Sequence, residues 1–130
     1  MSAADVAPAG TGNEERGEHE LVLGGKTYVL RPSFEAIAAA EKKAGYALTV
    51  LARMANTGEL SLRQVGVIAA ELIRAGSDSD FVRNVDDERI AQLAYEAGMR
   101  TIMPRLALVL IDAALGGRKA SGEAKAVAES

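Results

Sequence analysis

The sequence predicts an α+β domain in which an N-terminal β-hairpin packs on a bundle of four to five helices. Two short runs with alternating apolar residues meet at a glycine pair between residues 20 and 30, and helical spacing of apolar residues then continues to residue 115. The ends of the chain lack any such period. We therefore predict a single domain, 19–115, between a disordered leader, 1–18, and a disordered tail, 116–130.

The hairpin prediction rests on a two-residue turn between alternating strands. The apolar residues that alternate with polar or small ones are Leu21, Leu23, Tyr28 and Leu30. Gly24 and Gly25 can supply the positive φ angles that a tight hairpin turn needs. Pro32 then ends the second strand, since it has no N–H to donate to a neighbouring strand.

Capping residues define the first two helices. Ser33 is a suitable N-cap for a helix from Phe34 to Ala44, whose apolar positions include Phe34, Ile37 and Ala38, and Gly45 stands where a glycine commonly ends a helix. A second helix is predicted over residues 47–55. Its apolar side is formed by Leu48, Leu51, Ala52 and Ala55.

The next part of the chain holds the clearest helix start and a polar loop. Ser61 and Gln64 form a capping-box pattern for a third helix that ends at Gly76. Residues 77–85 read as a loop anchored by Phe81 and Val82. Asp86 is then a suitable N-cap for a fourth helix. Its buried stripe is predicted to be Ile90, Leu93, Ala94 and Ala97, with Gly98 at its end.

The last helix is unusually apolar. It is predicted to start near Thr101, with Pro104 in its first turn, where a missing N–H costs nothing. Apolar residues cover most of its circumference, and Thr101, Arg105 and Asp112 form its polar stripe. The preferred interpretation places this helix centrally in the bundle. The alternative is an exposed partner-binding face formed by Leu108, Ile111 and Leu115.

Composition narrows the function classes. The net charge is −3, which disfavours binding to nucleic acid, because that binding depends on basic residues that neutralise phosphates. The chain has no cysteine, which excludes disulfides and thiolate chemistry and fits a reducing cytoplasm. No apolar run is long enough to span a membrane. We therefore expect a cytoplasmic protein that binds neither nucleic acid nor membrane.

No motif predicts catalysis, a cofactor or a metal. Gly25-Lys26-Thr27 resembles the end of a phosphate-binding loop, but a glutamate stands where its first glycine belongs and a strand follows where a helix is needed. The acidic residues between 78 and 88 do not have calcium-loop spacing. His19, the single histidine, is expected to be exposed, and the basic residues of the helices are expected to be solvated. These basic residues are Lys42, Lys43, Arg53, Arg63 and Arg74. The chain is not expected to be an enzyme.

Two segments carry a resemblance to a known family. They are ELVLGGKTYVLRPSFEAIAAAEKKAG at 20–45 and LSLRQVGVIAAELIRAG at 60–76, followed by an acidic-capped helix and an Ala/Leu-rich last helix. In this order, over about residues 20–115, the chain resembles small tail-assembly proteins of the gene transfer agent and siphophage type. These proteins are often described as phage tail assembly chaperones and are sometimes labelled tail tube proteins.

The resemblance implies a non-enzymatic role in assembling a phage-like tail. As a chaperone, the protein would act beside the tail tube protein, bind the tape-measure protein and shield the apolar helices of that protein. The contact surface would be formed by Leu108, Ile111 and Leu115. The alternative is a structural tail component, in the tube or at its completion, that self-associates into a homo-oligomer and stays with the particle. An open hairpin edge would suit such association by strand addition.

Overall fold

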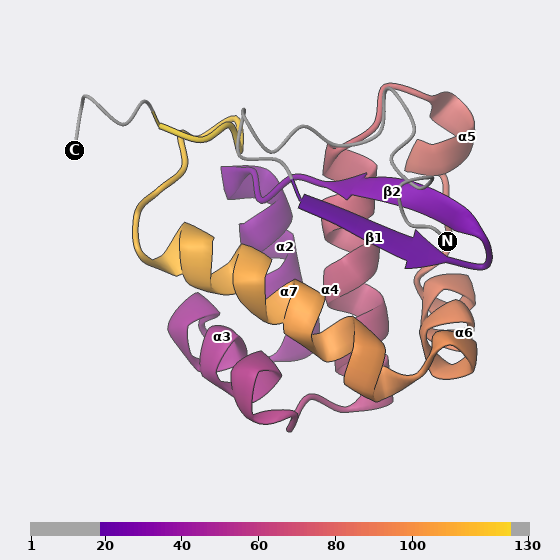
Figure 1. The fold of residues 1–130 in the computed structure, drawn as a ribbon. Helices are drawn as coiled ribbons and strands as arrows, with labels where there is room; N and C mark the ends of the chain where they lie inside the picture. Colours follow the sequence, from indigo (N-terminus) through magenta and orange to yellow (C-terminus); the bar gives the residue numbers. More distant parts are fainter. Residues whose placement is uncertain (1–18, 126–130) are drawn as a thin grey trace, which may run out of the picture.

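A computed structural model describes residues 19–125, in which a β-hairpin lies against a helical bundle (Figure 1). The elements follow in the order β1 (His19–Leu23), β2 (Lys26–Leu30), α2 (Phe34–Ala44), α3 (Leu48–Thr57), α4 (Leu62–Ala75), α5 (Asp80–Arg83), α6 (Asp87–Ala97) and α7 (Met99–Ala114). The predicted α+β class is confirmed. The predicted leader and the last five residues of the predicted tail lie outside the described residues.

The hairpin forms as predicted. β1 and β2 pair antiparallel, with Leu23 opposite Lys26. The turn between them has φ of 59° at Gly24 and 77° at Gly25, which is the left-handed conformation that a two-residue turn of this kind requires. Leu21, Leu23 and Leu30 are buried. The hairpin therefore has one apolar face, and that face covers the bundle.

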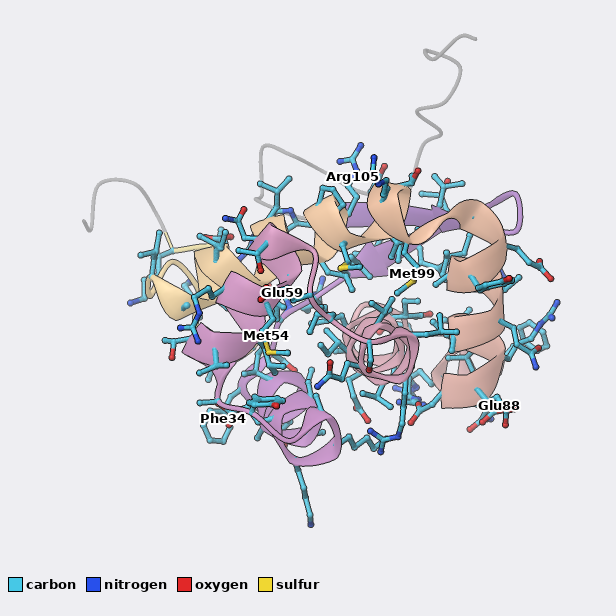
Figure 2. The ribbon with its side chains drawn as sticks, turned by 90° about the horizontal axis from the view of Figure 1, so that it is seen from below. Phe34, Met54, Glu59, Glu88, Met99 and Arg105 are labelled. Atoms are coloured by element: carbon cyan, nitrogen blue, oxygen red, sulfur yellow. The ribbon has the colours of Figure 1, made fainter. Side chains whose placement is uncertain are left out.

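Helix α4 is the centre of the bundle. It packs against α2, α5, α6, α7 and β2, and Figure 2 shows it nearly end-on with the other helices around it. Its predicted capping box is present, since Ser61 Oγ accepts from the Gln64 amide at 3.0 Å and Gln64 Oε1 accepts from the Ser61 amide at 2.8 Å. Its buried residues are Val65, Gly66, Val67, Ile68, Ala69, Ala70, Leu72 and Ile73.

Small residues bring the neighbours of α4 close to it. A Cβ atom on Gly66 would lie 2.6 Å from the Cβ of Ala91 in α6. At the other end of α4, a Cβ on Gly76 would collide with the carbonyl oxygen of Val29 in β2. These two glycines set how closely α6 and the hairpin approach the central helix.

The buried side of α2 differs from the prediction. The residues that it buries are Ala36, Ala40 and Ala44. Phe34, predicted as part of the apolar side, is 71% exposed, and Ala38 is exposed as well. The reason is the close packing of α2 on α4, which alanines permit and a phenylalanine at the interface would prevent.

The segment predicted as a polar loop contains the short helix α5, which Ser79 caps by accepting from the Val82 amide at 3.4 Å. Val82 packs against the core, as predicted. The prediction of Phe81 as a second anchor is wrong, because its side chain is 81% exposed. Phe81 and Val82 point about 100° apart on this short helix, and Val82 is the one that faces the core.

Helix α7 begins two residues earlier than predicted. A single residue, Gly98 with φ of 105°, separates it from α6, and the Gly98 carbonyl accepts from the amides of Thr101 and Ile102. Pro104 is therefore the sixth residue of the helix and lies beyond its first turn. The helix packs on α3, α4, α6 and β1 with one side, and its other side is exposed, so α7 combines features of both interpretations. It buries Ile102, Met103, Leu106, Ala107, Val109 and Leu110.

Residues 116–125, predicted as part of the disordered tail, form a loop that we call the C-terminal loop. An isolated β-bridge pairs Arg118 with Ala124. The Ala120 carbonyl accepts from the Phe34 amide at 2.8 Å, at the start of α2. This contact with α2 lies beyond the predicted domain end at residue 115. The Phe34–Ala120 contact joins chain segments far apart in sequence, which periodicity cannot reveal.

Candidate interaction surface

The outer side of α7, together with its C-cap residue, carries a group of exposed side chains. We call it the α7 strip, and it consists of Arg100, Thr101, Pro104, Arg105, Leu108 and Leu115. Leu108 is 54% exposed and Leu115 is 81% exposed. The two leucines are seven residues apart, so they lie on the same side of the helix about 10 Å from one another. Such large exposed apolar side chains favour contact with another protein surface.

The predicted partner-binding residues separate into two groups. Leu108 and Leu115 lie on the α7 strip, whereas Ile111 is partly buried and packs against the core. The strip also includes Thr101 and Arg105 from the predicted polar stripe. The structure thus brings two predicted leucines together with two arginines, and their binding to a partner stays a prediction. Helical spacing alone could have placed Arg105 beside Leu108, three residues away.

The α7 strip is positively charged. Arg100 and Arg105 are exposed, and in the sequence of α7 Asp112 is the single acidic residue. The guanidinium of Arg118, in the C-terminal loop, pairs with the Asp112 carboxylate, with Nε 2.8 Å and Nη2 2.5 Å from Oδ2. Arg118 Nη1 also donates to the Gly122 carbonyl at 3.0 Å. Asp112 therefore neutralises Arg118 and leaves the two strip arginines as the charge of this surface.

His19 lies beside the same carboxylate and is not an exposed residue as predicted. Its Nε2 is 3.4 Å from Asp112 Oδ2, and its side chain is 25% exposed. Burial lowers the pKa of His19 and outweighs the hydrogen bond to Asp112, which raises it. The charges of Arg118 and Arg105 also lower this pKa, and the charge of Asp112 raises it. The neutral imidazole is thus the form that this position favours.

A second polar cluster joins α2, α4 and α6. Glu71 Oε2 lies 2.6 Å from Lys43 Nζ and 3.1 Å from Arg74 Nη1. Asp87 pairs with both cations as well, at 3.1 Å from Lys43 and closer to Arg74. Arg74 also donates to the Val85 carbonyl at 3.0 Å. Lys43 and Arg74 therefore hold three helices together, where the sequence predicted solvated side chains.

The pKa values of this cluster move in opposite directions. The hydrogen bond to Glu71 raises the pKa of Lys43 above its usual value. Burial raises the pKa of Asp87, but hydrogen bonds from Arg74 and Lys43 lower it by more. Each shift favours the charged form, as an alternating arrangement of two cations and two carboxylates requires. The cluster is explained by its role in holding the helices together.

The other sequence motifs have structural explanations where the chain is described. Gly25-Lys26-Thr27 forms the hairpin turn and the start of β2. Between residues 19 and 125, no three His, Asp or Glu side chains are grouped so as to hold a metal ion. No helix in this range is long and apolar enough to cross a membrane.

Comparison with known proteins identifies the family. A family model described as "Phage tail tube protein, GTA-gp10" matches residues 16–117, which is more than half of the chain. Searches of curated proteins and of solved structures returned no match. The matched range includes the hairpin, all the helices and the α7 strip. The chain therefore belongs to the phage tail tube protein family of the gene transfer agent gp10 type.

Proposed function

We propose that this protein is a structural component of a phage-like tail and that its copies associate through the α7 strip. The observation that carries the proposal is the exposure of Leu108 and Leu115 on one side of α7 in a chain of the tail tube family. A tail is built from many copies of its subunits, so its components need surfaces for one another. Removing the apolar surface of the two leucines from water favours such contacts.

The rigidity of α7 supports this role. The side of the helix opposite the strip is fixed in the core, with Ile102, Leu106 and Val109 fully buried. Leu108 therefore sits on a well-supported helix, with Leu115 at its C-cap, and binding through Leu108 costs little conformational entropy in the backbone. Arg105, one turn before Leu108, provides a charged group that can orient a partner.

The test compares wild type with Leu108→Ser/Leu115→Ser by size-exclusion chromatography with light scattering over a range of concentrations. We expect the wild-type mass to rise with concentration and the variant to remain monomeric with its melting temperature nearly unchanged. Tyr95→Ser is the matched control, because Tyr95 is 69% exposed on α6, outside the strip. A wild type that stays monomeric and is absent from purified particles would contradict the proposal.

A second candidate function is that of a tail assembly chaperone for the tape-measure protein. The seven-residue spacing of Leu108 and Leu115 favours it, because that spacing matches the apolar repeat of a long amphipathic helix. Co-expression with the tape-measure protein tests it. A soluble complex that the double serine variant fails to form, together with absence of the protein from finished particles, would favour the chaperone over the structural component.

A further inference from the structure

The leader, residues 1–18, joins the domain beside the α7 strip. β1 packs on α7 (Figure 1), and the first residue of β1, His19, lies 3.4 Å from Asp112. Asp112 is four residues after Leu108 and seven after Arg105, so all three lie on the same side of the helix. The residues that precede His19 therefore reach the domain on the side of α7 that carries the strip.

The leader is acidic. It contains Asp5, Glu14, Glu15 and Glu18, against Arg16 as its basic residue. Three of these four carboxylates stand in the five residues that directly precede β1. The part of the leader that is closest to the domain in sequence therefore carries a net negative charge.

The α7 strip offers the opposite charge. Arg100 and Arg105 are exposed, and neither side chain makes an ion pair or a hydrogen bond within residues 19–125. None of the six residues of the strip is acidic. The charge of Arg105 also lowers the pKa of His19, so this arginine acts at the point where the leader joins the domain. A carboxylate of the leader that reaches the strip can therefore pair with either arginine.

The spacing of the glutamates fits the distance along α7. Arg105 is about 10 Å along the helix from the residue that His19 contacts. Glu15 and Glu14 are four and five residues before His19, and an extended chain of that length spans at most about 13–18 Å. These two glutamates can thus reach Arg105, and the chain that connects them to β1 then passes over Leu108.

We propose that the leader binds across the α7 strip of its own chain and competes there with a second copy. Glu14 and Glu15 pair with the strip arginines, and the chain between these glutamates and β1 covers Leu108. The inference rests on the proposed function, because it assigns a control of self-association to the same strip.

Weak ion pairs are sufficient for this competition, because the leader and the strip belong to one chain. Exposed pairs contribute little individually, but a short tether gives an effective concentration in the millimolar range. A contact with an affinity in that range covers the strip in about half of the copies at any moment. The apparent affinity for a second copy falls with the uncovered fraction. Copies then stay apart in dilute solution and associate where many of them gather.

Disulfide trapping tests the contact in the full chain, which has no cysteine of its own. Thr11→Cys/Thr101→Cys, the strip pair, joins the leader to the strip. Thr11→Cys/Val22→Cys is the control pair, because Val22 is 57% exposed on β1, only three residues after His19. The oxidant is a small uncharged disulfide, and each rate is divided by the reactivity of the separate cysteines. The strip pair should form its intramolecular disulfide faster than the control pair.

Charge exchange then identifies the groups that pair. Glu14→Lys/Glu15→Lys should slow the strip pair by about twofold or more and leave the control pair unchanged. Adding Arg100→Glu/Arg105→Glu should restore the rate of the strip pair, because opposite charges again face each other. Melting temperatures show whether each variant folds. If the strip pair does not respond to these exchanges, or forms no faster than the control pair, the leader contact is wrong while the proposed function stands.

Sedimentation velocity at low salt tests the competition. Glu14→Gln/Glu15→Gln should tighten self-association by about twofold or more, because more copies have an uncovered strip. Glu35→Gln/Asp78→Asn makes the same charge change at exposed residues outside the leader and should leave self-association unchanged. Equal association of wild type and the leader variant overturns the inference. A wild type that is monomeric at every concentration and absent from particles contradicts both the proposed function and the competition, whereas the trapping rates report on the leader contact alone.

Discussion

The Cβ position of Gly66 lies 2.6 Å from the Cβ of Ala91, so α4 and α6 meet at a point where no side chain fits. We predict that Gly66→Ala destabilises the fold. Inside a helix, alanine is about 1 kcal/mol more favourable than glycine. The overlap with Ala91, however, forces α6 to shift, and such overpacking typically costs about 1–3 kcal/mol. Denaturation in urea, followed by circular dichroism, measures the balance.

Ala91→Gly in the Gly66→Ala background is the matched test of this cause. Removing the opposing methyl group should recover part of the lost free energy of unfolding, although glycine in α6 has its own helix cost. If Gly66→Ala is as stable as wild type, the two helices are not held together as closely as this contact requires.

The second prediction concerns Glu71, whose side chain is 14% exposed between two cations. Glu71→Gln should lower the free energy of unfolding by about 1–3 kcal/mol, because Lys43 and Arg74 then face each other with Asp87 as their shared carboxylate. Asp80→Asn is the control. It removes an exposed pair with Arg83 and should change stability by less than about 1 kcal/mol. Equal losses in the two variants would contradict the structural role of the cluster.

The third prediction is a pH dependence that originates at His19. Its pKa in the folded chain is below 6.5, chiefly through burial, so folding favours the neutral form. Neutral His19 therefore contributes its full stabilisation of the fold above pH 6.5. This stabilisation is lost as the pH falls through the pKa of His19 in the folded chain. We expect the melting temperature of wild type to fall between pH 7.5 and 5, and that of His19→Asn to fall less.

Asp87 titrates in a separate window. The pKa of Asp87 is below 3.8, so its contribution is present above that pH and is lost as the pH falls through the folded pKa. A difference between wild type and His19→Asn above pH 5 can thus be assigned to the imidazole. Parallel melting curves for the two proteins over this range would contradict the assignment.

The fourth prediction concerns Arg118, whose side chain is 5% exposed. Arg118→Gln should release the C-terminal loop, because an amide cannot replace the guanidinium contacts to Asp112 and Gly122. The readout is hydrogen exchange at the Phe34 amide, which donates to Ala120 in this loop and should exchange faster in the variant. Lys119→Gln, a change at an exposed neighbour, should leave that amide protected.

Local signals explain what could be predicted from the sequence. The Gly24–Gly25 turn and the Ser61–Gln64 capping box depend on residues close in the chain, and both are present as expected. Helix α2 has its predicted bounds for the same reason, since Ser33 caps its start and Gly45 ends it with φ of 88°. Leu108 and Leu115 could be assigned to one side of α7 because helical geometry alone fixes that relationship.

The errors concern burial, which depends on the whole fold. Phe34 and Phe81 are exposed although aromatic, because alanines form the contact of α2 with α4 and Val82 supplies the anchor of α5. His19 is partly buried because Asp112, 93 residues away, lies beside it. Leu48 shows the same limit for caps, since its amide donates to the Glu41 carboxylate across a turn at 2.7 Å. The His19–Asp112 pair lies outside any short window, and the Glu41–Leu48 pair follows no standard capping pattern.

The position of β1 also sets the order in which the chain can complete its fold during synthesis. β1 is made first, yet the helices that it packs against are α6 and α7. The ribosome must therefore produce most of the domain before the leucines of the hairpin are fully covered. The first strand to be made is the last to gain its complete set of neighbours, and a nascent chain stopped at Gly98 would still lack α7 beneath it.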